Sequence, residues 1–317
     1  MRILITGSSG HLGEAVIRVL KKSHYNFVSM DIKPSEYTTH VGSITDQGFV
    51  KKCMKDVDVV VHTATLHKPH VATHRDQDFI DINLTGTLNL LEESVAQGIQ
   101  SFICTSTTST FGDMLTPKMN EPAIWITEEV QSIPKNIYGV TKNAAEDVCQ
   151  LFYRNHNLPC LILKMARFFP EEDDNMEVRQ LYKDANSKAN EFLYRRVDIE
   201  DAVTATLLAI EKAQEIGFGK YIISATSPFT QKDLVDLQLN APSVVKKIYP
   251  DYKELYQLEN WKMFPTIDRV YVNEKARTEL GWKPKHDFRH ILNCLKEGKD
   301  FRSQLSIDVG VKGYPEV

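Results

Sequence analysis

The stretch YGVTK places a tyrosine and a lysine four residues apart, as Tyr138 and Lys142. Residues at this spacing share one face of a helix. A tyrosine hydroxyl ordinarily releases its proton near pH 10, and a nearby ammonium group stabilises the resulting phenolate. The pair is therefore a candidate for removing a proton from a substrate hydroxyl, although the same spacing also occurs in ordinary surface pairs.

A glycine-rich turn, TGSSGHLG, follows the first predicted strand and carries Gly7, Gly10 and Gly13 in the spacing GxxGxxG. Glycine permits a positive φ and close approach of the backbone to a pyrophosphate, which then faces a helix N-terminus. This context predicts dinucleotide binding. Asp31 ends the next predicted strand, where a carboxylate binds ribose hydroxyls and repels a 2′-phosphate, so NAD is favoured over NADP.

The elements that must position these residues alternate between strand and helix. The predicted strands cover 2–6, 27–31, 56–64, 101–106, 159–166 and 220–226, and the predicted helices cover 14–22, 78–98, 136–157 and 195–213. The strands are continuous apolar runs, which is typical of a parallel sheet covered on both faces. We therefore predict an α/β fold with a Rossmann-type doubly wound parallel sheet and a smaller, mostly helical C-terminal substrate lobe.

The regular alternation of strands and helices ends near residue 170, and this change indicates two domains. Residues 1–170, with contributions from about 190–226, are predicted to form an NAD-binding Rossmann domain. Residues 171–317 are predicted to form a discontinuous substrate-binding lobe.

The composition excludes several classes of protein. Of 317 residues, 42% are hydrophobic and 25% charged, and the net charge of −4 gives no electrostatic footprint for nucleic acid. The five cysteines are scattered, which favours reduced thiols over a disulfide framework or a metal site. Without a signal peptide or an apolar run that spans a bilayer, the chain is expected to be cytoplasmic, with no membrane partner.

Several motifs in order resemble the extended branch of the short-chain dehydrogenase/reductase superfamily, the NAD-dependent epimerase/dehydratase family. They are TGSSGHLG, VVVHTA (59–64), NLTGTLNLLE (83–92), TSTTSTFG (105–112), YGVTK (138–142) and ELGWKP (279–284). The resemblance covers the whole chain and is strongest over 1–170. It implies an enzyme that binds NAD and oxidises a hydroxyl of a sugar or sugar nucleotide.

The resemblance also implies site residues. The catalytic set is Thr107, Tyr138 and Lys142, with Thr107 matched by counting back from FG among hydroxyl neighbours of similar chemistry. The implied cofactor contacts are Gly7, Ser9, Gly10, His11, Leu12, Gly13, Asp31, Ile32, Ser43, Ile44, Thr63, Ala64, Thr65, Asn83, Thr105, Tyr138, Lys142, Met165 and Ala166.

The substrate end departs from the family pattern. Arg167 replaces a common asparagine, and Lys262 stands near the place of an arginine that grips a nucleotide pyrophosphate. Arg167 either holds an anionic substrate group or pairs with a neighbouring carboxylate in EEDD (171–174). His67, His70 and Thr108 are further substrate candidates, and either histidine is a candidate acid/base near neutral pH. The alternative is that both are solvated loop histidines.

The sequence leaves the reaction open. Re-reduction of the ketone on its other face would make the enzyme a nucleotide-sugar epimerase, and release of the ketone would make it a dehydrogenase or reductase. A 4,6-dehydratase is disfavoured, because Thr108 and Ser109 stand where that branch has Asp-Glu. A non-catalytic dinucleotide sensor is a further alternative. The resemblance also implies a homodimer built on the helix over 83–97 and the helix that carries Tyr138.

Overall fold

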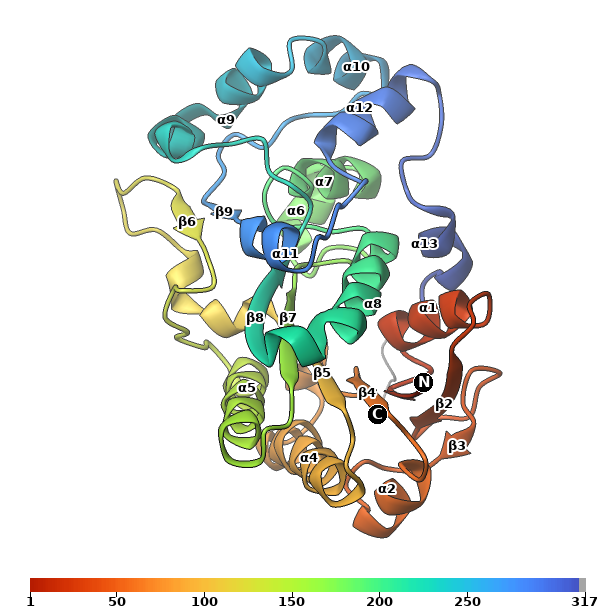
Figure 1. Cartoon of the computed structure of the whole chain (residues 1–317). Helices are drawn as coiled ribbons and strands as arrows, with labels where there is room; N and C mark the ends of the chain where they lie inside the picture. Colours follow the sequence, from red (N-terminus) through yellow and green to blue (C-terminus); the bar gives the residue numbers. More distant parts are fainter. Residues whose placement is uncertain (314–317) are drawn as a thin grey trace.

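The structure, a computed structural model, describes residues 1–313, and within that range a sheet of seven parallel strands forms the centre of the molecule (Figure 1). The strand order is β3–β2–β1–β4–β5–β7–β8. These strands are β1 (Arg2–Thr6), β2 (Asn26–Asp31), β3 (His40–Val41), β4 (Val59–His62), β5 (Ser101–Thr107), β7 (Cys160–Met165) and β8 (Phe218–Ile223). The order reverses between β1 and β4, and ligands of such sheets bind at the crevice this reversal creates.

Helices cover both faces of the sheet (Figure 1). On one face lie α1 (His11–Leu20) and α8 (Ile199–Ile216), and on the other lie α2 (Gln47–Cys53), α4 (Gly86–Gln97) and α5 (Ile137–His156). Because side chains alternate along a strand, Ile3 and Ile5 join the core beneath α1 and α8, while Leu4 joins the core beneath α2 and α4. The prediction of a doubly wound α/β fold is confirmed.

The C-terminal part forms a second, mostly helical core above the sheet (Figure 1). Helices α7 (Asp184–Glu191), α9 (Leu234–Ile248), α10 (Tyr252–Leu258) and α12 (Phe288–Lys296) contribute to this core. Helix α6 (Met176–Leu181) precedes α7, α11 (Glu274–Glu279) packs on β8, and α13 (Gln304–Val309) returns to pack on α1 and α8. A small parallel ladder joins β6 (Ile124–Ile126) to β9 (Arg269–Tyr271). The long connection over 112–136 is therefore tied to the C-terminal part by β6.

The helix predicted over 78–98 is present, but it contains a π-helical segment. A short helix α3 (Asp76–Phe79) leads into a π-helical turn at Ile80–Thr85, and α4 begins only at Gly86. The extra residue of a π turn commonly marks a functional region, and here it carries Asn83. Among residues 1–313, no helix is both long and apolar enough to cross a membrane.

Candidate functional site

A cavity of about 770 Å³ opens along the carboxyl ends of β1, β2, β4, β5 and β7. Its walls come from the glycine loop, from the loops after these strands, and from residues of the C-terminal part. Every residue predicted from the sequence to contact cofactor or substrate lines this cavity, with the exception of Asn83. The fold thus gathers residues from 7 to 167 at one edge of the sheet.

The glycine loop has no room for side chains at two of its three glycines. Gly7 has a φ of +72°, and a Cβ atom there would lie 2.6 Å from the Ala64 nitrogen. A Cβ atom at Gly13 would lie 2.1 Å from the Gly7 carbonyl oxygen, so helix α1 packs directly on the turn. Gly10 is less constrained, with 3.2 Å to the same oxygen. The backbone is thereby exposed to the cavity as a pyrophosphate-binding loop requires.

Asp31 lies at the end of β2 and fixes the neighbouring backbone. Its two carboxylate oxygens accept hydrogen bonds from the Ser9 nitrogen at 3.0 Å and from the Lys33 nitrogen at 2.9 Å. Ser43 shares a 2.8 Å hydrogen bond with Thr45. Together the open glycine loop and the carboxylate at the strand end fit the phosphates and ribose of NAD.

Asn83 supports the cavity wall from behind. It is buried, and its Oδ1 accepts hydrogen bonds at 2.8 Å from the Thr65 hydroxyl and from the Leu66 nitrogen. Its amide nitrogen donates to the Leu66 carbonyl at 3.1 Å and to the Thr141 hydroxyl at 3.2 Å. Asn83 therefore joins the loop after β4 to helix α5, and the structure places it behind the cavity surface.

Tyr138 and Lys142 are buried side by side on the face of α5 that meets the sheet. Asn136 begins the helix by accepting the Gly139 backbone N–H at 3.0 Å. The Lys142 ammonium donates to the Thr105 carbonyl at 2.6 Å, and the Thr107 side chain lies close enough to Tyr138 to lower its pKa by hydrogen bonding. Two neighbouring hydroxyl groups have partners other than Tyr138. Ser106 donates to Glu146 at 2.5 Å, and the Thr108 hydroxyl lies 3.4 Å from the Met165 carbonyl.

The electrostatics of Tyr138 differ from the expectation drawn from YGVTK. Burial raises the pKa of the phenol to about 12, and only the hydrogen bond with Thr107 opposes this increase. The Lys142 ammonium is directed at the Thr105 carbonyl and does not make the phenol acidic by itself. Tyr138 is therefore neutral at pH 7 in the protein without cofactor.

The expectation that a loop histidine titrates near neutral pH is wrong for His67. Burial, with smaller contributions from His70 and Lys142, lowers the pKa of His67 to about 3. Its ring stands 6.3 Å from the Tyr138 ring and 5.4 Å from the Phe169 ring, while its backbone N–H donates to His70 at 2.8 Å. Burial also lowers the pKa of His70. Both rings line the cavity.

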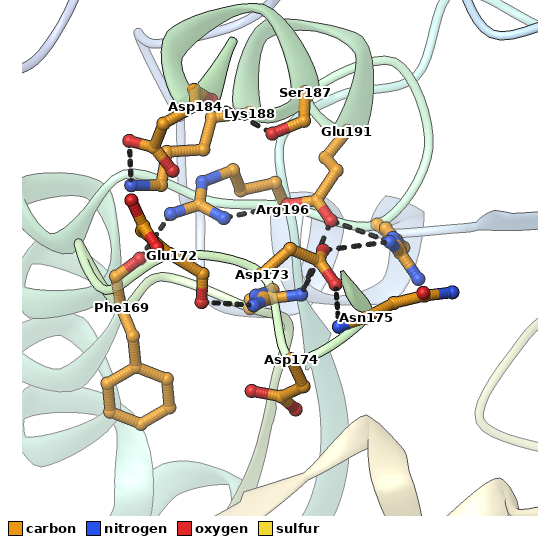
Figure 2. Close-up of polar contacts among 12 residues, drawn as sticks. Phe169, Glu172, Asp173, Asp174, Asn175, Asp184, Ser187, Lys188, Glu191 and Arg196 are labelled. Carbon is orange, nitrogen blue, oxygen red and sulfur yellow. Dashed lines mark hydrogen bonds and ion pairs between the residues drawn. The ribbon is translucent and has the colours of Figure 1, made fainter. Parts of the chain in front are cut away.

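Arg167 lines the cavity and also forms the ion pair that the sequence left as an alternative. Its guanidinium lies 2.7 Å from Asp173 and 3.5 Å from Glu191. Glu191 is buried, also pairs with Arg196 at 2.7 Å and Arg195 at 2.6 Å, and consequently has a pKa lowered to about 2 despite its burial. Figure 2 shows the Glu191 carboxylate facing Arg196, with Asp173 close by in the same network.

The segment between β7 and α7 is held by further polar contacts in the same network (Figure 2). Asp173 accepts from the Asn175 nitrogen at 2.8 Å, and Lys188 contacts Asp184 and the Pro170 carbonyl, each at 2.5 Å. Arg196 donates to the Phe169 carbonyl. The acidic run after Arg167 is therefore an ordered wall of the site.

Four cavity residues escape a reading of the sequence because they come from distant segments. They are Arg195, Arg269, Tyr271 and Lys312. These residues belong to no recognisable sequence motif. The pairing of β6 with β9 and the return of the chain over α1 bring them to the site. Lys262 does not line the cavity, because its backbone is bound by Asn186 and Asn190 instead.

Comparison with known proteins decides the family. A sequence profile described as the NAD dependent epimerase/dehydratase family matches residues 3–223, which include the glycine loop, Tyr138, Lys142 and Arg167. The chain belongs to this family. The resemblance read from the motifs is thereby confirmed, as are the expectation of an NAD-dependent enzyme and of NAD as its cofactor.

Members and structural neighbours of the family match at low identity. An uncharacterized protein, y4nG, of Sinorhizobium fredii is 29% identical over 51% of this chain, but the match spans only 39% of that protein. UDP-arabinose 4-epimerase 1 of Arabidopsis thaliana is 25% identical, over 90% of this chain and 75% of its own length.

A solved structure supports the family fold. A short-chain dehydrogenase/reductase superfamily protein of Agrobacterium tumefaciens, determined with bound NAD, has a TM-score of 0.65 at 20% identity and covers 94% of this chain and 98% of its own. At that identity the likeness establishes the fold.

Proposed function

We propose that this member of the NAD-dependent epimerase/dehydratase family oxidises a hydroxyl of a sugar or sugar nucleotide and returns the hydride to the other face, as an epimerase. The proposal rests on one arrangement, in which Tyr138, Thr107 and Lys142 share the wall of a cavity that begins at the glycine loop. Further support comes from the matching relative named as a UDP-arabinose 4-epimerase.

Different residues of the cavity would bind the cofactor, transfer the proton and exclude water. The glycine loop, Asp31 and Lys142 would hold NAD, which supplies a hydride acceptor and a positive ring when bound. Tyr138 would take the proton of the substrate hydroxyl, while Thr107 shares a hydrogen bond with the phenol and the reacting oxygen. His67 and Phe169 close the space beside Tyr138 and would exclude water from the reacting carbon.

The test uses a substitution that removes only the phenol hydroxyl. We expect Tyr138→Phe to bind NAD with unchanged affinity and to lose turnover by about 100- to 10,000-fold, the usual contribution of a positioned acid–base group. Tyr153→Phe is the matched control, because Tyr153 lies on the same helix but packs against Phe218 outside the cavity. NAD binding is measured by calorimetry, and turnover is measured with a panel of sugars and sugar nucleotides.

The same panel separates the candidate reactions. Isomer formation without lasting absorbance of reduced nicotinamide supports the epimerase, and lasting absorbance identifies a dehydrogenase instead. Wild-type turnover by Tyr138→Phe would contradict the proposed role of the phenol. A protein that binds NAD and turns over no member of the panel would favour the sensor alternative.

A homodimer is part of the proposal. Val95 on α4 and Val140 and Leu151 on α5 are apolar side chains that are 37%, 49% and 41% exposed. Burial of such residues between two copies of the α4–α5 pair would remove apolar surface from water. Sedimentation analysis checks the expected mass of two chains.

A further inference from the structure

The chain returns to the cofactor end of the cavity after helix α13. This helix packs beside α1 (Figure 1), and its last residue, Val309, is buried in the core that α1 and α8 share. Residues 310–313 continue from the anchored helix, and we refer to them as the C-terminal strap. Lys312 and Gly313 of the strap line the same cavity as the glycine loop.

Two carboxylates hold Lys312 in place. Its ammonium donates to Glu14 on α1, a side chain that is only 7% exposed. Its backbone nitrogen donates to Glu171 at 3.2 Å, and Glu171 in turn lies 2.9 Å from the ring nitrogen Nε2 of His11. Because His11 is the first residue of α1 and belongs to the glycine loop, the strap joins this loop to the acidic segment after β7.

Glu14 organises both α13 and the strap. Its second oxygen accepts from Arg18 at 2.7 Å, and Arg18 also donates to the Asp308 carbonyl in the last turn of α13 at 3.2 Å. Glu14 lies in the first turn of the helix whose N-terminus would face the cofactor pyrophosphate. A negative charge there opposes binding of an anion unless cations balance it, as Arg18 and Lys312 do.

The strap can open without disturbing the helix that anchors it. Gly310 has a φ of +62°, a conformation that favours glycine, and it marks the point where the chain leaves α13. Val311, the apolar side chain of the strap, is 68% exposed, so little apolar surface holds the strap closed. Segments with few buried apolar contacts open at a lower free-energy cost than the core.

We propose that the C-terminal strap closes over the pyrophosphate of bound NAD and slows its release, held by the ion pair between Lys312 and Glu14. Lys312 is a positioning residue in this arrangement. The inference rests on NAD as the cofactor and not on the reaction that follows. Slow release would suit the proposed epimerase, which returns the hydride within the site, whereas a dehydrogenase must exchange its cofactor.

The first test measures the rate at which the cofactor leaves the protein. Bound NADH is displaced by excess NAD in a stopped-flow instrument, and the change in NADH fluorescence gives the dissociation rate. We expect Lys312→Gln to release NADH about 10-fold faster, because it loses one charge-assisted hydrogen bond, and Lys312→Arg to keep most of the slow release. Lys299→Gln is the matched control, because Lys299 pairs with Glu297 at the surface outside the cavity.

Glu14→Gln separates the strap from a direct contact between Lys312 and the pyrophosphate. If the ion pair holds the strap closed, removal of either partner speeds release, so Glu14→Gln should also release NADH faster. If Lys312 acts on the phosphates directly, removal of the negative charge at Glu14 should instead slow release. Slower or unchanged release in folded Glu14→Gln would overturn the inference, and so would unchanged release in Lys312→Gln.

Hydrogen exchange provides a readout that does not depend on turnover or on Glu14→Gln. In the NAD-loaded protein, the backbone amides of 310–313 should exchange more slowly in wild type than in Lys312→Gln, while those of α13 stay unchanged. Equal exchange of the strap amides in both proteins would contradict the proposed closure. Loss of turnover in Tyr138→Phe tests the proposed reaction alone, so the reaction and the strap can fail separately.

Discussion

A buried ion pair formed by helix α5 allows a quantitative prediction. Glu146 lies two helical turns after Tyr138 on α5, with its side chain fully buried, and it contacts the buried Lys164 ammonium at 2.8 and 3.0 Å. Lys220 lies 3.0 Å from the same carboxylate, and Ser106 donates to it at 2.5 Å. Although burial acts to raise the pKa of Glu146, the two lysines hold it below its ordinary value.

Glu146→Gln removes the charge and keeps the size of the side chain. The Lys164 ammonium, 2% exposed, would then lack its carboxylate. Removal of one partner from a buried pair typically costs about 3–5 kcal/mol. Because the amide oxygen of glutamine still accepts one hydrogen bond, we expect a loss near the lower end, about 3 kcal/mol in the free energy of unfolding.

The assay is urea unfolding followed by circular dichroism at pH 7 without cofactor. Asp147→Asn is the matched control, because Asp147 is the next residue on α5, is 62% exposed and lies 3.7 Å from Lys220. It should change the free energy of unfolding by less than about 0.5 kcal/mol. A Glu146→Gln cost below about 1 kcal/mol would refute the reasoning, since it would mean that the ammonium finds water or another partner.

Two further predictions follow from the site. Gly13→Ala should abolish NAD binding or folding, whereas Gly10→Ala should weaken NAD binding mildly. The new Cβ atoms would lie 2.1 Å and 3.2 Å, respectively, from the Gly7 carbonyl oxygen. Calorimetry with NAD measures binding and circular dichroism measures folding, and equal NAD affinities of the two variants would contradict the packing argument. Glu191, with its pKa lowered to about 2, stabilises the fold above the ordinary value near 4.5 and loses that contribution as pH falls. Between pH 6 and pH 3 the free energy of unfolding should fall by about 2 kcal/mol more in wild type than in Glu191→Gln. Urea unfolding of both proteins across this pH range measures the difference, and an equal fall in the two proteins would contradict the prediction.

The parts of the site that follow one another along the chain could be predicted from the sequence. Gly7 and Gly13 are constrained by contacts within one βα turn, and Tyr138 and Lys142 by one helical turn. Such local geometry is encoded by residue type and spacing alone. Thr107, inferred by counting back from FG, lines the cavity together with Tyr138, and its catalytic role stays a prediction.

Long-range contacts account for what the sequence did not reveal. Arg195 and Arg269 reach the cavity only through the β6–β9 ladder and its neighbours, and no local pattern encodes that pairing. Arg167 pairs with Asp173, as one alternative drawn from the sequence allowed, but its second contact, with Glu191 on helix α7, joins residues 24 positions apart. The pKa of His67 likewise depends on how deeply the loop is buried. Each of these properties is set by packing between segments that are far apart in sequence.

The raised pKa of Tyr138 has a consequence for the order of events. With a pKa of about 12, the phenol is ionised in about one molecule in 100,000 at pH 7, equivalent to about 7 kcal/mol. A unit positive charge about 4 Å away is worth about 4 kcal/mol at an effective dielectric constant of about 20. Lys142, bound to the Thr105 carbonyl, does not supply this in the free protein. On the proposed mechanism, the positive ring of bound NAD would supply part of this free energy, so the phenol would become a better base once cofactor is bound. This dependence would also keep the buried phenol inert toward other molecules in the cavity until the hydride acceptor is in place.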